Sequence, residues 1–173
     1  MADASRDGAG GRLYLDDLRV GQRFASGTHT IDEAEIVGFA KQFDPQPFHL
    51  DDAAARGTLF GGLAASGWHT AAITMRLQVE GGLPVMGGIV GAGGEFAWPS
   101  PARPGDILRV ETEIVEIKPS RSRPDRGMVT VKSDTRNQRD EIVFTLTARL
   151  VVPRRPAADG RSTGAGPGAR NAP

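Results

Sequence analysis

SGWHTAAITMRLQV, residues 66–79, is the stretch from which the fold is inferred most directly. Apolar side chains occupy nearly every side of a helix drawn through it: Trp68, Ala71, Ala72, Ile73, Met75 and Leu77. A helix that is apolar all round is buried rather than amphipathic. Gly81 and Gly82 follow and stop the helix. We therefore expect one central, buried helix.

Segments on either side of this helix have the features of strands. In chain order they are 23–30, the Gly-rich stretch 88–98, Leu108–Ile114, the surroundings of Val129 and Val131, and Ile142–Leu150. The third and the last alternate apolar and polar residues, as half-buried strands do. Asn137–Asp140 is polar and predicts a hairpin turn. Helices followed by consecutive strands predict an α+β fold, with a long antiparallel β-sheet wrapped around the central helix.

An earlier helix is expected over residues 32–43. Asp32 is a suitable N-cap, and Glu35 stands three residues later, as in a capping box. Apolar residues then recur at helical spacing, which predicts one buried stripe: Ile36, Phe39, Ala40 and Phe43. Pro45 and Pro47 cannot continue the helix, so it ends near residue 43.

Composition excludes several classes of protein. The chain has 173 residues, with 21 Lys and Arg balancing 21 Asp and Glu, so it lacks the basic excess of a nucleic-acid binder. No apolar run is long enough to span a membrane, and the first residues lack the apolar core of a secretory signal. Cysteine is absent, which removes disulfides and thiolate chemistry. We expect a cytoplasmic protein with no membrane partner.

The two ends differ from the middle of the chain. Residues 1–12 and 154–173 are rich in small and polar residues that cannot anchor a hydrophobic core. Such segments do not bury enough apolar surface to offset the entropy of ordering. We therefore expect disordered tails at 1–12 and 154–173, and one folded domain over 13–153.

FDPQPFH, residues 43–49, contains the clearest candidate chemistry. Asp44 and His49 lie on a short proline-bound segment after the first helix. A carboxylate and an imidazole held close together can position a water molecule and transfer protons. An ordinary surface turn is the alternative, because Asp-Pro is common in turns.

The beginning of the central helix is the second candidate site. A helix N-terminus presents free N–H groups, and Gly67 allows a ligand to approach them closely. Such N–H groups can polarise a thioester or another carbonyl oxygen. The alternative is a simple N-cap at Ser66. The spacing of His29, His49 and His69 matches no metal-binding motif, so we expect no metal site.

Three motifs resemble the MaoC-like (R)-specific enoyl-CoA hydratase family. Residues 43–49 are similar to its Asp-x-Asn-Pro-x-His motif, residues 61–70 to the start of its central helix, and residues 96–106 to its next strand and Arg-Pro-Gly-Asp turn. The order of the three motifs makes the likeness specific. The chain departs from the family at Gln46, where the motif has Asn, and at Trp68, where many members have a smaller residue.

This resemblance implies a hot-dog fold and an acyl-CoA thioester as substrate. It implies a hydro-lyase that adds water to a trans-2-enoyl-CoA, or removes it, without a metal or redox cofactor. Asp44 and His49 would be the catalytic pair, with substrate-binding roles for Gln46, Ser66, Gly67 and Trp68. Relatives usually dimerise, so we expect a homodimer or a higher even oligomer. An acyl-CoA thioesterase and a non-catalytic acyl-CoA-binding protein remain alternatives.

Overall fold

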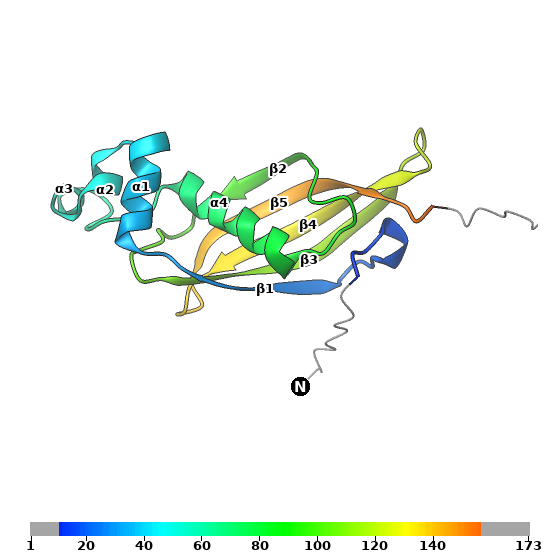
Figure 1. The fold of residues 1–173 in the computed structure, drawn as a ribbon, viewed down its shortest axis with the longest axis horizontal. Coiled ribbons are helices and arrows are strands. Elements are labelled where there is room, and N and C mark those ends of the chain that lie inside the picture. Colours follow the sequence, from blue (N-terminus) through cyan, green and yellow to red (C-terminus); the bar gives the residue numbers. More distant parts are fainter. Residues whose placement is uncertain (1–10, 157–173) are drawn as a thin grey trace, which may run out of the picture.

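A five-stranded antiparallel sheet, in the order β1-β3-β4-β5-β2, forms one layer of the molecule (Figure 1). The structure is a computed structural model that describes residues 11–156. The strands are β1 (Arg23–Thr30), β2 (Gly91–Ala97), β3 (Ile107–Pro119), β4 (Arg126–Arg136) and β5 (Ile142–Pro153). All five lie where the sequence predicts strands, and the predicted hairpin turn joins β4 to β5. The alternation of apolar and polar residues explains why β3 forms, because every second side chain of a strand points to the core. The buried side chains of β3 are Leu108, Val110, Thr112 and Ile114.

Helix α4 (Gly67–Leu77) lies along one face of this sheet (Figure 1). Its N-cap is Ser66, and a single π-helical turn over Gln78–Gly82 continues it. Gly81 adopts a φ of 155°, which only glycine tolerates well, and the helix ends there as predicted. The α+β class and the hot-dog arrangement expected from the sequence are thus confirmed.

The prediction that α4 is buried on all sides is wrong. Three polar residues on the covered side of the helix are buried: Thr70, Thr74 and Gln78. Ile73 and Leu77 are buried beside them and belong to the apolar core. Thr74 and Thr135 hydroxyls lie 2.6 Å apart, and the Gln78 amide donates to Ser133 at 2.8 Å. The opposite face is apolar and open: Trp68 is 56%, Met75 42% and Val79 57% exposed. The sheet of one chain covers only one side of the helix.

Three helices gather at one end of the sheet (Figure 1): α1 (Glu33–Phe43), α2 (Pro47–Leu50) and α3 (Asp52–Arg56). The predicted cap of α1 is confirmed, because the Asp32 carboxylate accepts from Glu35 N at 2.8 Å. The predicted stripe is correct for Ile36 and Ala40, which are fully buried. It is wrong for Phe43, which is 63% exposed, because the helix ends beyond the edge of the core.

Two buried apolar clusters fill the space between the sheet and the segments that cover it. One lies under α1 and α4 and includes Ile36, Ile73, Leu108, Val110 and Val143. The other includes Leu15, Val85, Ile114, Val129 and Leu150. Within residues 11–156, no helix is long and apolar enough to cross a membrane.

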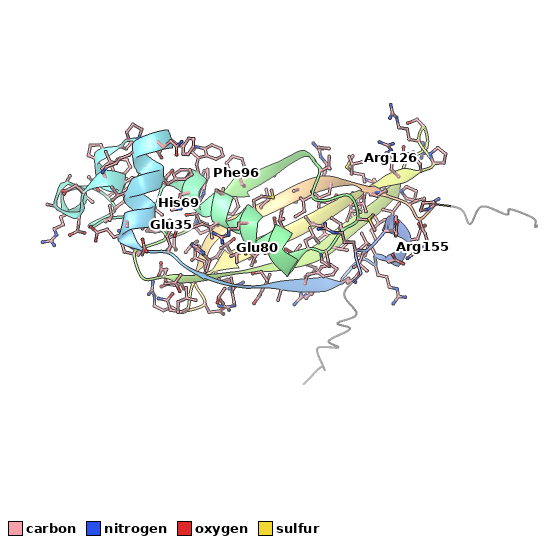
Figure 2. All side chains as sticks on the ribbon, viewed as in Figure 1. Glu35, His69, Glu80, Phe96, Arg126 and Arg155 are labelled. Atoms are coloured by element: carbon pink, nitrogen blue, oxygen red, sulfur yellow. The ribbon has the colours of Figure 1, made fainter. Side chains whose placement is uncertain are left out.

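The described part of the chain extends beyond the predicted domain boundary at residue 153. Arg155 donates to the Asp17 carboxylate at 2.8 Å and lies over the Tyr14 ring (Figure 2). Arg154 N donates to Asp125 O at 2.7 Å. Arg154 and Arg155, which belong to the predicted C-terminal tail, are thus bonded to the folded domain. Residues 1–10 and 157–173 of the two predicted tails lie outside the described residues.

We predict that Asp32→Ala lowers the free energy of unfolding by about 1 kcal/mol, because it leaves the Glu35 N–H without its cap. Glu33→Ala, one residue further along, removes no cap and is the control. Urea denaturation of both variants measures the effect. Equal stability of the two variants would contradict the role of Asp32.

Candidate active site

Asp44 and His49 lie close together at the junction between the end of α1 and α2. Asp44 is the C-cap of α1, and Pro47 begins α2 at a position that needs no hydrogen-bond donor. Gln46 N donates to Asp44 O at 2.7 Å and His49 N to Gln46 O at 2.9 Å, which folds the segment tightly. As a result, His49 Nε2 lies 3.4 Å from Asp44 Oδ2.

The His49 ring is held in one orientation. The residue is only 4% exposed, and Nδ1 lies 2.8 Å from the carbonyl oxygen of Ala64. A carbonyl can only accept, so Nδ1 carries the hydrogen and donates it. In neutral imidazole the lone pair is then on Nε2, the nitrogen that faces Asp44.

Two donors hold the Asp44 carboxylate. The Ser66 hydroxyl donates to Oδ2 at 2.6 Å, and the Gln46 amide donates to Oδ1 at 2.7 Å. Partial burial by itself raises the pKa of Asp44. The two hydrogen bonds, helped by the positive charge that His49 carries whenever it is protonated, outweigh burial and bring the pKa below its ordinary value of 3.8. Asp44 is therefore ionised at neutral pH.

The first turn of α4 lies next to Asp44 and His49. Ser66 caps the helix by accepting from Trp68 N at 3.2 Å, so one hydroxyl serves both the helix and Asp44. Trp98 packs directly on Gly67, and its indole Nε1 donates to Gly67 O at 2.9 Å. A Cβ on Gly67 would lie 2.7 Å from the Trp98 ring. Only glycine fits at this first helical position.

A cavity of about 590 Å³ opens beside these groups. Asp44 and His49 supply polar atoms, and Gly67 brings the helix N-terminus to the wall. Most of the remaining wall is apolar and aromatic: Phe48, Phe60, Trp68, Trp98, Ala102 and Val143. An apolar cavity with a few converging polar groups is the usual form of a small-molecule site.

The structure gathers the residues singled out in the sequence, with one change of position. Gln46, Gly67 and Trp68 line the cavity beside Asp44 and His49. Ser66 is fully buried, and its hydroxyl contacts Asp44 instead of the cavity. Sequence reasoning did not single out Trp98 or the Ala64 carbonyl. Trp98 lies within the family-like stretch 96–106, whereas a backbone carbonyl leaves no signal in the residue types.

A second cluster of titratable groups lies between α1, α4 and β1. Glu35 and His69 face each other across the two helices (Figure 2), with His69 Nε2 at 3.5 Å from Glu35 Oε1. His29 Nε2 lies 2.9 Å from Glu35 Oε2. His69 also stacks on Phe39, with ring centroids 4.6 Å apart. Burial lowers the pKa of His69 below 6.5, and the nearby Glu35 charge only partly opposes this. Glu35 thus bonds the two histidines instead of completing a capping box with Asp32.

The chain is similar in sequence and in fold to dehydratases and hydratases. The family model described as MaoC like domain matches residues 18–137. The solved structure of a MaoC-like dehydratase from Rhodospirillum rubrum is 63% identical, with a TM-score of 0.83 over 84% of this chain and 99% of that chain. The 3-hydroxybutyryl-CoA dehydratase of Methylorubrum extorquens is 32% identical over 85% of this chain and 88% of that protein. An R-hydratase from Pseudomonas aeruginosa is 26% identical, with a TM-score of 0.66 over 90% of this chain and 97% of that chain.

We predict that His69 makes folding sensitive to mild acid. Its pKa is lower in the folded state than in the unfolded state, so the unfolded chain binds more protons once the pH falls below about 6.5. Stability is therefore full above that pH and declines below it, with a slope of at most about 1.4 kcal/mol per pH unit for one proton.

Denaturation curves of the parent and of His69→Gln between pH 7.5 and pH 5 measure this slope. The difference in stability between the two proteins should shrink or reverse as the pH falls, because a glutamine at this position takes up no proton when the chain unfolds. Parallel pH dependence would show that His69 does not titrate differently on folding.

Proposed function

Because the chain belongs to the MaoC-like dehydratase family, we propose that it reversibly adds water to the double bond of a trans-2-enoyl-CoA. One observation carries the proposal. A carboxylate and an imidazole lie 3.4 Å apart on the wall of an apolar cavity, beside the N-terminus of a helix. The relative from Methylorubrum extorquens, named as a 3-hydroxybutyryl-CoA dehydratase, supports the same chemistry.

Asp44 and His49 act on a water molecule in this proposal. The lone pair on His49 Nε2 accepts one hydrogen of the water, and the ionised Asp44 carboxylate accepts the other. The proton passes to Nε2 as the water oxygen bonds to the β-carbon of the substrate. The Asp44 carboxylate stabilises the imidazolium that forms. The same proton then leaves Nε2 for the α-carbon, which completes the addition of water.

The N-terminus of α4 stabilises the charge that develops on the substrate. When the water oxygen attacks, the electron pair of the double bond moves toward the thioester oxygen. In this proposal the N–H of Gly67, a residue that lines the cavity, donates to that oxygen. The Trp98 ring fills the space that a side chain on Gly67 would need, so a larger residue here would have to displace the indole from the cavity wall.

Mass spectrometry of a panel of trans-2-enoyl-CoAs tests the proposal. Incubation with the protein should add the mass of one water molecule to at least one member of the panel. Release of free CoA would instead indicate an acyl-CoA thioesterase. No change in any member would favour a non-catalytic acyl-CoA-binding protein.

We predict that Asp44→Asn and His49→Ala each lower turnover by at least about 10²-fold, the usual contribution of general acid–base catalysis. The two residues act together on one water molecule, so the double variant should be little slower than the slower single variant. Turnover of a trans-2-enoyl-CoA measures the effect, and circular dichroism checks that each variant folds. Near-parental rates in both folded single variants would eliminate this pair as the catalytic machinery.

The open face of α4 supports a second copy of the chain as partner. Strand β2 lies at the edge of the sheet and all of its residues are exposed. Phe96 of β2 lies beside α4 and packs on Trp68, with ring centroids 5.5 Å apart (Figure 2). A free strand edge next to an exposed apolar surface favours association. We propose a homodimer, or a higher even oligomer, that covers this face.

Light scattering of the parent should give twice the chain mass of 18.3 kDa, or a higher even multiple. Phe96→Arg places a charge on the proposed interface and should shift the population toward monomer at micromolar concentration. Val20→Arg is the control, because Val20 is 63% exposed and lies outside β2 and α4. A parent that is monomeric at micromolar concentration would refute the assembly.

A further inference from the structure

Residues 57–66 border the proposed active site, yet they form neither helix nor strand. The segment brings Phe60 and Ala65 to the cavity wall. It also supplies the Ala64 carbonyl that accepts from His49, and Ser66, which donates to Asp44. No helix or sheet hydrogen bonds fix the backbone here, so its precise position must come from other contacts.

Arg103 supplies three of those contacts, in addition to the backbone bonds from Ala64 N to Phe48 O at 3.3 Å and from Ala65 N to Ala102 O at 2.9 Å. Its guanidinium donates through Nη1 to Gly62 O at 2.7 Å and to Leu63 O at 3.1 Å, and through Nη2 to Phe60 O. A rigid, planar guanidinium can bond several carbonyls at once, which the single ammonium of a lysine does poorly. Three carbonyls of the irregular segment are thus fixed by one side chain.

The arginine is itself anchored to the sheet. Arg103 N donates to the Asp106 carboxylate at 2.8 Å, and Asp106, which directly precedes β3, is 2% exposed. From the other side of the segment, the Asp52 carboxylate accepts from Leu63 N at 2.9 Å, and this bond holds the pKa of Asp52 below its ordinary value. The backbone between Phe60 and Leu63 is therefore held from both sides.

We propose that Arg103 is a positioning residue for the reaction proposed above, acting through the Ala64 carbonyl on His49. Ala64 directly follows Leu63, whose carbonyl Arg103 binds. The Ala64 carbonyl decides which imidazole nitrogen of His49 carries the hydrogen. Loss of the guanidinium releases the segment, so that His49 no longer keeps its hydrogen on Nδ1 and its lone pair on Nε2. Arg103 itself does not line the cavity, so its effect reaches the substrate only through these neighbours.

The test compares Arg103→Met with Arg109→Met. Arg109 also donates to a backbone carbonyl, Asn137 O at 3.0 Å, and pairs with Asp140 at 2.6 Å, but none of these residues lines the cavity. Both substitutions remove a guanidinium and keep a long side chain. The readouts are kcat and KM for a trans-2-enoyl-CoA and the ¹⁵N NMR signals of the imidazoles, which are readily assigned because the chain has 3 histidines.

In the parent and in Arg109→Met, His49 should show a single neutral tautomer with its hydrogen on Nδ1. In Arg103→Met, the other tautomer should appear, and kcat should fall by about 10²-fold, as expected when a catalytic group moves by about 1 Å. KM should change much less than kcat. Arg103→Lys, which keeps the charge and one donor group, should recover part of the loss and provides the same readouts if Arg103→Met does not fold.

Two results would overturn the positioning role. One is a folded Arg103 variant that keeps the parental tautomer of His49. The other is an Arg103 variant whose kcat matches that of Arg109→Met. The NMR signal does not depend on turnover. A change of tautomer in a protein whose parent hydrates no enoyl-CoA would therefore support the positioning role and contradict the proposed reaction.

Discussion

The Ser66 hydroxyl donates to Asp44 Oδ2 at 2.6 Å, and this bond joins the end of α1 to the beginning of α4. Ser66 is fully buried, and its hydroxyl also accepts from Trp68 N as the cap of α4. If the hydroxyl rotated away from Asp44, the Trp68 N–H would lose its hydrogen-bond partner. The bond fixes one oxygen of the carboxylate beside His49 and favours the charged form of Asp44. The cavity, the orientation of the pair and the access to the α4 N-terminus all depend on this junction.

The sequence predicts most of the secondary structure because its signals are local. The alternation from Leu108 to Ile114 appears as β3 with those residues buried, and the Asp32 cap appears as an observed hydrogen bond. The short distance between Asp44 and His49 is also predictable from local sequence. Two prolines end one helix and begin another within a few residues, so the backbone has little freedom to separate the two side chains.

Features that depend on distant segments could not be predicted. The composition of α4 does not say which side faces the sheet, and the structure buries Thr74 and Gln78 while it exposes Trp68 and Met75. Thr74 is compatible with burial only because Thr135, on another strand, provides its hydroxyl as partner. Likewise, the guanidinium of Arg103 bonds residues some forty positions earlier in the chain. Only the folded arrangement reveals such pairings.

A crystal structure of a folded Asp44→Asn variant with a bound trans-2-enoyl-CoA tests the central claim most directly. If the proposed mechanism is correct, the acyl group occupies the cavity, with the thioester oxygen within hydrogen-bond distance of Gly67 N. The β-carbon then faces the space between residue 44 and His49. An acyl group bound elsewhere, or one whose thioester oxygen points away from α4, would contradict the mechanism.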